Sequence, residues 1–222
     1  MSSRPGTSKP EIVLSSAMSL DGRISTRAGD SRISSQDDLV RVHALRARMD
    51  AILVGSGTVL ADDPCLTTRL VDGPSPLRVV VDGRARTPPG ARVLDDGAPT
   101  VIYVSRKAPS GRVAALQEKC DVVVLGEEHV DLAAMLDDLD ARGVRTAMLE
   151  GGGGLNAAMF AAGLVDKVHI TVAPFVIGGK DSVPLVGGDG VTSVDDAPHL
   201  ELENVEVIGA EVLLRYRVQR CD

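Results

Sequence analysis

The segment Glu150-Gly151-Gly152-Gly153-Gly154 has the most chemically suggestive spacing in the chain. It follows a predicted strand, 146–149, and precedes a predicted helix, 155–162. Glycines at a strand end let ligand phosphates approach the backbone, and a helix N-terminus offers free N–H groups and a positive dipole. We interpret the segment as an anion site, most readily for a nucleotide, although a tight strand-to-helix turn would also explain it. Glu150 stands where ligands bind parallel sheets, or is a solvated strand end.

A second glycine cluster, Gly-Ser-Gly-Thr at 55–58, follows the predicted buried strand 51–54. Its glycines again permit a ligand to approach the backbone, and Thr58 adds a hydroxyl group. Asp62 and Asp63 lie just beyond, where they bind a ligand or simply cap and turn the chain.

Arginines are the expected partners of an anionic ligand, and they are concentrated in the first half of the chain. Residues 1–100 carry 13 basic and 12 acidic groups, a net charge of +1, whereas residues 101–222 carry 11 and 19, a net charge of −8. Arg46 lies beside the apolar stripe of a predicted helix, where a cation requires an anion from the protein or from a ligand. Arg84 and Arg86 follow a strand end and could hold a phosphate, or are ordinary surface residues.

The composition sets limits on the class of protein. The chain has 222 residues, of which 44% are hydrophobic, 25% charged and only 2% aromatic, with a net charge of −7. These proportions exclude a disordered, collagen-like or coiled-coil protein, and they disfavour binding to nucleic acid. Cys65, Cys120 and Cys221 show no metal-ligand spacing, so no metal site is expected. The longest apolar run, 157–165, is too short to cross a membrane, and no signal peptide is visible, so a cytoplasmic location is expected.

Short apolar runs alternate with helical segments along most of the chain, which is typical of βαβ units and a mostly parallel sheet. Residues 1–10 are expected to be a disordered leader and residues 11–219 one domain. Helix 34–49 is predicted to begin at a capping Ser34 or Ser35 and to bury the stripe Leu39, Val42, Leu45 and Met49, with His43 packed rather than catalytic. The final strands, 168–172, 200–207 and 212–218, are predicted to be antiparallel. The remaining predicted strands are 12–17, 77–81, 101–104 and 122–125, and the remaining helices are 113–119 and 132–141.

Six segments, in unbroken order, together resemble the riboflavin-biosynthesis reductases, most closely their stand-alone archaeal type. The segments are SSAMSLDGRIS (15–25), DSRISS (30–35), DLVRVHALRARMDAILVGSGTVLADDPCLT (38–67), RVVVDGRAR (78–86), LEGGGGLNAAMF (149–160) and GLVDKVHITVAPFVIGGK (163–180). The resemblance implies an α/β, dihydrofolate-reductase-like fold with a mostly parallel central sheet, antiparallel C-terminal strands and helices on both faces. It also implies a homodimer that uses NADPH. The implied reaction delivers hydride to C1′ of a ring-opened ribosylaminopyrimidine phosphate and gives the ribitylamino product.

The resemblance also assigns residues to ligands. For the cofactor it implies Thr58, Asp62, Asp82, Gly83, Arg84, Gly151, Gly152, Gly153 and Gly154, with Ala17 and Gly126 in the same cleft. For the substrate it implies Ser31, Arg46, Leu66, Arg69 and Glu150. Arg84 is then expected to meet the 2′-phosphate of NADPH, and Arg46 and Arg69 the ribose 5′-phosphate. Glu150 is the expected catalytic residue, either orienting the pyrimidine or moving a proton.

Three alternatives stay open. The bifunctional bacterial relatives carry a zinc deaminase domain with an H-x-E and P-C-x-x-C signature, which this sequence lacks, so we expect reduction without deamination. The first alternative is nevertheless that the substrate is the deaminated pyrimidine. A pterin reductase would use Asp37 or Asp38 as its helix carboxylate, although both are also explained as capping residues. A catalytically silent NADPH-binding paralogue is the third alternative.

Overall fold

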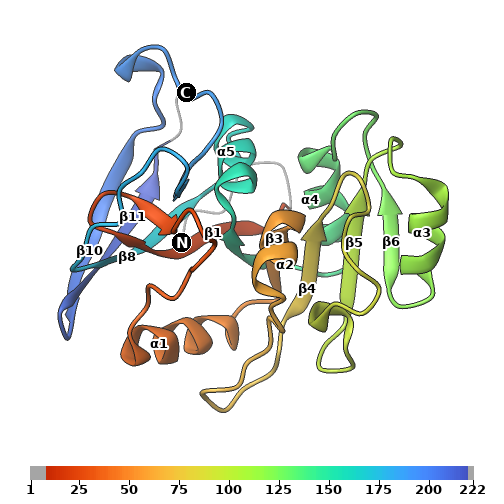
Figure 1. Cartoon of the computed structure of the whole chain (residues 1–222), viewed down its shortest axis with the longest axis horizontal. Coiled ribbons are helices and arrows are strands. Elements are labelled where there is room, and N and C mark those ends of the chain that lie inside the picture. Colours follow the sequence, from red (N-terminus) through yellow and green to blue (C-terminus); the bar gives the residue numbers. More distant parts are fainter. Residues whose placement is uncertain (1–8, 220–222) are drawn as a thin grey trace.

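The computed structural model describes residues 9–219, and within them one twisted sheet organises the chain (Figure 1). The sheet has the order β10-β11-β8-β1-β7-β3-β4-β5-β6, and a separate two-stranded ribbon pairs β2 with β9. The strands are β1 (Glu11–Ser19), β2 (Arg23–Ser25), β3 (Ala51–Gly55), β4 (Leu77–Val81), β5 (Thr100–Val104), β6 (Asp121–Val124), β7 (Thr146–Gly151), β8 (Lys167–Ala173), β9 (Val183–Pro184), β10 (Leu200–Ile208) and β11 (Glu211–Val218). The helices are α1 (Gln36–Arg46), α2 (Ser56–Asp62), α3 (Ser110–Gln117), α4 (Leu132–Ala141) and α5 (Gly153–Ala161), with 3₁₀ turns at Arg92–Leu94 and Val194–Asp196.

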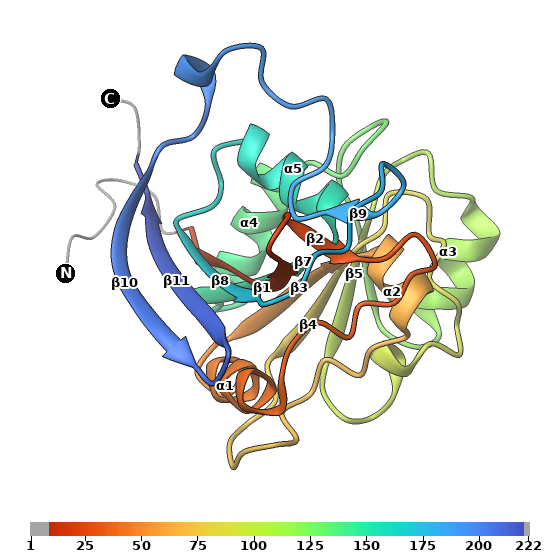
Figure 2. The ribbon, with the colours of Figure 1, turned by 60° about the vertical axis from the view of Figure 1, so that its left-hand side comes forward.

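The sheet is parallel from β8 to β6 and antiparallel at its other end. Of the three strands predicted to be antiparallel, β8 instead runs parallel to β1, because the α5 crossover returns the chain to the same end of the sheet. Only β10 and β11 form the predicted antiparallel hairpin, at the outer end of the sheet (Figure 2). The predicted mostly parallel α/β sheet is therefore confirmed, with its antiparallel part confined to the last hairpin.

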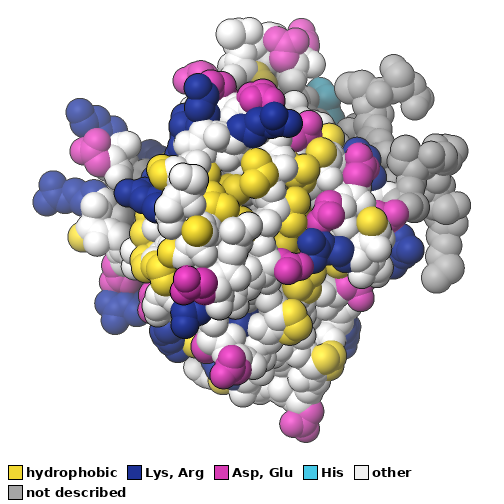
Figure 3. All heavy atoms as spheres, turned by 90° about the vertical axis from the view of Figure 1, so that its right-hand side faces the viewer, with side chains coloured by type: hydrophobic (Ala, Val, Ile, Leu, Met, Phe, Trp, Pro, Cys, Tyr) yellow, Lys and Arg dark blue, Asp and Glu magenta, His cyan; other side chains and the backbone are white. Residues whose placement is uncertain are grey.

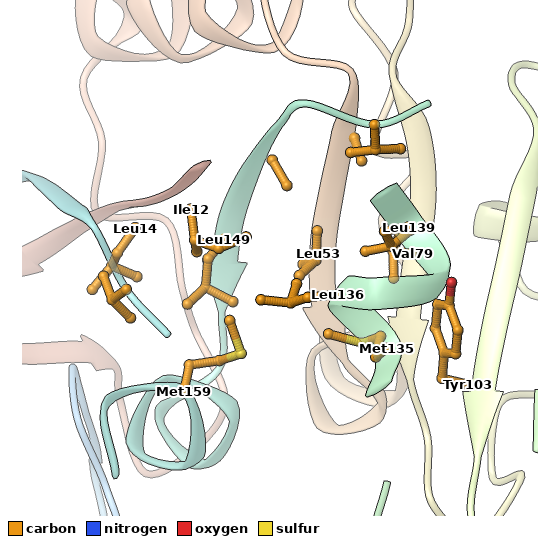
Figure 4. Close-up of a cluster of buried hydrophobic side chains, with 14 of the residues drawn as sticks. Ile12, Leu14, Leu53, Val79, Tyr103, Met135, Leu136, Leu139, Leu149 and Met159 are labelled. Carbon is orange, nitrogen blue, oxygen red and sulfur yellow. The ribbon is translucent and has the colours of Figure 1, made fainter. Parts of the chain in front are cut away.

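Aliphatic side chains form a core on each face of the sheet. On one face, α4 and α5 pack Met135, Leu136, Leu139 and Met159 against Ile12, Leu14, Leu53, Val79 and Leu149 of the strands (Figure 4). On the other face, Val59 of α2 and Leu116 of α3 pack with Ile52, Val54, Val80, Ile102 and Val104. Because the chain has only four aromatic residues, these aliphatic side chains supply the apolar surface that the fold buries.

Helix α1 differs from the prediction in its limits and in its buried face. Its cap is Ser35, whose hydroxyl accepts a hydrogen bond from the backbone N–H of Asp38, and it ends at Arg46 rather than at Met49. The residues it buries are Asp38 and His43, whereas Leu39 is 38% exposed. The Asp38 carboxylate accepts hydrogen bonds from Thr171 Oγ1 of β8 at 2.7 Å and from Arg41 Nε at 2.8 Å. Polar contacts therefore join α1 to the sheet, and the predicted apolar stripe faces elsewhere.

The expected leader, residues 1–10, lies outside the described residues except for Lys9 and Pro10. Strand β1 begins at Glu11, and β11, which belongs to the same sheet, ends at Val218. Helix α2 was not predicted, because Gly55, its N-cap, and Gly57, within it, favour a loop by composition. Gly55 is the last residue of β3 and has extended φ/ψ angles, so the helix begins directly after the strand.

Candidate active site

A cleft of about 940 Å³ opens at the carboxyl ends of the parallel strands β1, β3, β4 and β7. This is where open α/β sheets bind ligands. Its volume lies near the upper end of the roughly 300–1,000 Å³ typical of small-molecule sites, as two ligands lying side by side would require. The predicted site residues that line it are Ala17, Ser31, Arg46, Thr58, Asp62, Leu66, Gly83, Arg84, Glu150, Gly152, Gly153 and Gly154.

The glycine segment forms a close-packed turn between β7 and α5. Gly151 and Gly152 have φ values of 73° and 90°, a conformation that favours glycine. Thr58 Oγ1 donates a hydrogen bond to the Gly151 carbonyl at 3.0 Å, so α2 is fixed to this turn. A Cβ at Gly153 would lie 2.5 Å from the Pro184 carbonyl oxygen, whereas a Cβ at Gly154 would meet nothing within 4 Å. The first glycines of the segment therefore serve packing, and Gly154 leaves the helix N-terminus open towards the cleft.

Arg46 and Glu150 form a buried ion pair in the cleft wall. Arg46 Nε and Nη2 donate to the two Glu150 carboxylate oxygens, each at 2.6 Å, and the side chains are only 11% and 15% exposed. Such a two-point guanidinium–carboxylate pair fixes both side chains in direction as well as in charge. The anion that Arg46 was predicted to need is supplied by the protein, and both carboxylate oxygens of Glu150 are accepting hydrogen bonds. This arrangement suits orientation of a ligand better than donation of a proton.

Arg69 does not line the cleft, because it lies exposed on the loop after Leu66. Its backbone N–H donates to His43 Nδ1 at 2.9 Å, and its Nη1 donates to Thr67 Oγ1 at 3.1 Å. Arg46 Nη1 also reaches this loop, through the Thr67 carbonyl at 3.2 Å. Burial, together with Arg46 and Arg69, lowers the pKa of His43, which accepts its hydrogen bond as a neutral ring. His43 is thus packed, as predicted, and the two arginines converge on Thr67.

Asp82, Gly126 and Gly151 are the other predicted residues that do not line the cleft. Asp82 is fully buried, and its Oδ2 accepts hydrogen bonds from the Thr87 backbone N–H at 2.7 Å and from Thr87 Oγ1 at 2.8 Å. It therefore shapes the loop that presents Gly83 and Arg84. Gly126 has a φ of 80°, and a Cβ there would lie 2.2 Å from the His129 carbonyl oxygen. Its role in this fold is to close the turn after β6.

Arg84 lines the cleft on the loop after β4, two strands along the sheet from β7, which carries Glu150, and is 49% exposed. Its Nη2 lies 3.6 Å from Glu128 Oε2, and its Nη1 donates a long hydrogen bond of 3.5 Å to the Lys107 carbonyl. Arg86 is held more firmly, since its Nη2 donates to Ser56 Oγ at 2.7 Å and its Nε lies 3.9 Å from Asp82. A ligand can therefore engage the guanidinium of Arg84 with less rearrangement than that of Arg86.

Sequence reasoning missed several cleft residues. The apolar residues Leu39 and Val42, predicted to be buried, instead line the cleft near Arg46, which explains their spacing. Ser15, on β1, also lines it and is 3% exposed, with a hydroxyl that has no hydrogen-bond partner among the described residues. Glu128 and His129 line the opposite corner. The sequence carried one signal for Ser15, namely its position near the end of the predicted buried strand 12–17.

Asp21 holds the loop that leads from β8 to β9. Its carboxylate accepts hydrogen bonds from Ser19 Oγ at 2.6 Å and from the backbone N–H groups of Ile177 and Gly178 at 3.0 and 2.7 Å. The Ser19 hydrogen bond and these N–H groups lower the pKa of Asp21 to about 2. The same loop leads into β9, whose Val183 lines the cleft.

Residues 9–219 hold neither a metal-binding cluster nor a membrane-spanning helix. No cluster of three His, Cys, Asp or Glu side chains arranged for a metal ion occurs in this part of the chain. None of its helices is long and apolar enough to cross a membrane.

Comparison with known proteins gives a consistent set of relatives. The family model of the RibD C-terminal domain matches residues 10–214. The "2,5-diamino-6-ribosylamino-4(3H)-pyrimidinone 5′-phosphate reductase" of Methanothermobacter thermautotrophicus is 49% identical over 95% of this chain and 99% of its own length. The structure of Acinetobacter baumannii RibD superposes with a TM-score of 0.81 at 25% identity, over 96% of this chain and 59% of that one.

A more distant neighbour is similar in fold alone. Enterococcus faecalis dihydrofolate reductase, solved in complex with NADP(H) and RAB-propyl, superposes with a TM-score of 0.54 at 12% identity, over 95% of this chain and 97% of that one. The predicted dihydrofolate-reductase-like fold is thereby confirmed. With the family model spanning nearly all of the described residues, the chain belongs to the RibD C-terminal domain family, the reductases of riboflavin biosynthesis.

Proposed function

We propose that this chain reduces 2,5-diamino-6-ribosylamino-4(3H)-pyrimidinone 5′-phosphate to the ribitylamino product, with NADPH as the reductant. The observation that carries the proposal is the 49% identity, over 99% of its length, to a relative named for that reductase activity. The cleft supports it, since the exposed Arg84 lies at one end, the nearly buried Arg46–Glu150 pair lies at the other, and the open N-terminus of α5 lies between them. These are the features that two phosphate-bearing ligands require.

The cofactor is proposed to bind from Arg84 at one end of the cleft to the α5 N-terminus in its middle. Backbone N–H groups in the first turn of a helix lack partners within the helix and bind phosphate oxygens. Gly154 leaves this turn accessible, and Arg84 lies where a further phosphate can be met. When bound, a reduced nicotinamide supplies a hydride to C1′ of the substrate's imine form, and a proton adds to the neighbouring nitrogen. The chain's own contribution is to hold the two ligands side by side.

The substrate end is proposed to be the wall formed by Arg46, Glu150, Leu39 and Val42. The apolar side chains Leu39 and Val42 offer a surface for the pyrimidine, and the fixed carboxylate of Glu150 can accept a hydrogen bond from an amino group. Arg46 and Arg69, which converge on Thr67, supply positive charge for the ribose 5′-phosphate. Glu150 acts in this proposal as an orienting residue.

The chain is also proposed to form a homodimer from one reductase domain, residues 11–219. The exposed face of β10 supports this: Leu200, Leu202, Val205 and Val207 are 40%, 53%, 52% and 72% exposed. A register shift between Leu202 and Asn204 brings the four onto one face, opposite Val218, Tyr216, Leu214 and Val212 of β11. A native chain that sediments as a monomer at micromolar concentration would contradict the dimer. The cytoplasmic location stays a prediction.

A pterin reductase is less well supported by the geometry. Its helix carboxylate would be Asp37 or Asp38, and neither lines the cleft: Asp37 is exposed, and Asp38 is fully buried and hydrogen-bonded to Thr171 and Arg41. The test is NADPH oxidation, followed by nicotinamide absorbance, with the diaminated pyrimidine, its deaminated analogue and dihydrofolate in parallel. Preferred turnover of the diaminated compound is expected. Turnover of dihydrofolate alone would contradict the proposal, and NADPH binding without any turnover would indicate a silent paralogue.

A further inference from the structure

Two loops of opposite charge meet at the Arg84 corner of the cleft. The segment after β5 contributes Arg106 and Lys107, and the segment after β6 contributes Glu127 and Glu128. Arg106 Nε lies 3.1 Å from Glu127 Oε1, and Lys107 Nζ lies 3.1 Å from Glu128 Oε1. The second oxygen of Glu128 lies 3.6 Å from Arg84 Nη2. Glu128 is therefore placed between two cations, one of which is the proposed phosphate ligand.

Glu128 differs from its neighbour Glu127 in its relation to the cleft. Glu128 lines the cleft and is 60% exposed, whereas Glu127 does not line it and pairs only with Arg106. Both carboxylates are solvent-accessible, so their ion pairs are weak and can exchange partners. On the face shown in Figure 3, basic and acidic side chains are intermixed around a central apolar patch. At the Arg84 corner itself, the charges of Arg84, Arg106 and Lys107 are paired with Glu127 and Glu128, so local pairs rather than a broad field of one sign surround the site.

The position of Glu128 has opposite effects on the binding of NADPH, which carries a 2′-phosphate, and of NADH, which carries a free 2′-hydroxyl. A 2′-phosphate that approaches Arg84 meets the negative charge of Glu128 and competes with it for the guanidinium. An unphosphorylated ribose meets a carboxylate that can accept a hydrogen bond from its 2′-hydroxyl, the contact by which acidic residues select NADH in other folds. We propose that Glu128 is a specificity-determining residue, which lowers the preference of this site for NADPH over NADH. The inference rests on the proposed cofactor site.

The test is titration of the full chain with NADPH and with NADH, following nicotinamide fluorescence, at low and at physiological ionic strength. Glu128→Gln keeps the shape of the side chain and removes its charge. It is expected to raise the ratio of NADPH to NADH affinity by about two- to fivefold, the range of a half-exposed ion pair. The increase should shrink at the higher salt concentration, because exposed charges are screened. Glu127→Gln, the matched control, should leave the ratio unchanged.

The outcomes separate this inference from the proposed function. An unchanged or lower ratio in Glu128→Gln, in a native chain that binds both dinucleotides, would overturn the inference and leave the function standing. A native chain that binds neither dinucleotide would contradict the proposed function itself, and the inference with it. Titration with 2′-AMP and 5′-AMP gives a second reading, since only the 2′-AMP affinity should rise in Glu128→Gln. Equal thermal unfolding of the two glutamine variants will show that the fold is intact.

Discussion

The two ends of the cleft each carry an arginine–glutamate pair, and the pairs differ in nearly every physical respect. Arg46 and Glu150 are joined by two hydrogen bonds of 2.6 Å and are almost buried. Arg84 and Glu128 lie 3.6 Å apart, and about half of each side chain is exposed. A buried pair that loses one partner leaves an uncompensated charge, whereas an exposed pair exchanges its partner for water at little cost. The same residue types therefore form a fixed wall at one end and an exchangeable ligand contact at the other.

The largest effect is expected from breaking the buried pair. Arg46→Ala leaves Glu150 buried without its partner, so the free energy of unfolding should fall by about 3 kcal/mol, and kcat/KM for the pyrimidine by about 100-fold or more. Denaturant titration and steady-state kinetics measure the two effects. Arg48→Ala, an exposed position just beyond α1, is the matched control. Equal stability of the two variants would show that the pair is not structural.

The next effect concerns the glycines that lie between the two ends. Gly154→Ala adds a methyl group in open space at the α5 N-terminus, so stability should be unchanged or slightly raised while NADPH affinity falls on the order of tenfold. Gly153→Ala instead drives a Cβ against the Pro184 carbonyl and should lower the unfolding temperature. Calorimetry and cofactor titration distinguish the variants. Full NADPH affinity in Gly154→Ala would place the phosphates elsewhere.

A smaller effect is expected at the exposed pair. Arg84→Ala should weaken NADPH binding by about fivefold, with little effect on NADH or on stability, because this arginine is half exposed and loosely held. Arg106→Ala, an exposed cation outside the cleft lining, is the control. Titration with both cofactors measures the difference. A parallel loss of NADPH and NADH affinity would mean that Arg84 does not contact the 2′-phosphate.

The smallest effect is a pH dependence at Asp21, which holds the loop between β8 and β9. The pKa of Asp21 falls from 3.8 to about 2 on folding, so the ionised carboxylate stabilises the native state above pH 4, and this stabilisation is lost as the pH falls towards 2. Asp21→Asn should therefore be less stable than the native chain at pH 6 and approach it near pH 2. Thermal unfolding across this range tests the expectation. A constant difference at every pH would assign the effect to shape rather than to charge.

The sheet could be predicted from the sequence because its strands are continuous aliphatic runs, such as 51–54, and its crossovers carry recognisable helices. The direction of β8 could not, because the adjacent antiparallel hairpin has the same alternating pattern. The stripe on α1 was recognised, but the prediction that it is buried was wrong, because Leu39 and Val42 line a cleft that forms only when distant segments meet.

The site residues likewise fall into those that the sequence indicated and those that it did not. The glycine segment is recognisable from its composition. Thr58, Arg46 and Glu150, for which the family resemblance implied ligand contacts, line the cleft. Asp82 and Gly126 were also predicted to lie at the cofactor site, but they serve hydrogen bonding and turn closure inside the fold. Glu128 was missed because its significance depends on Arg84, 44 positions earlier, and only the folded chain brings their charges together.

The central claim is that one cleft holds a nicotinamide cofactor at the Arg84 end and a pyrimidine phosphate at the Arg46 end. A crystal structure of the chain with NADP⁺ and the ribitylamino product tests it most directly. We expect phosphate density at the α5 N-terminus, the 2′-phosphate beside Arg84, and the pyrimidine against the Arg46–Glu150 pair. A dinucleotide bound with its adenosine end at Arg46, or outside the cleft, would contradict it.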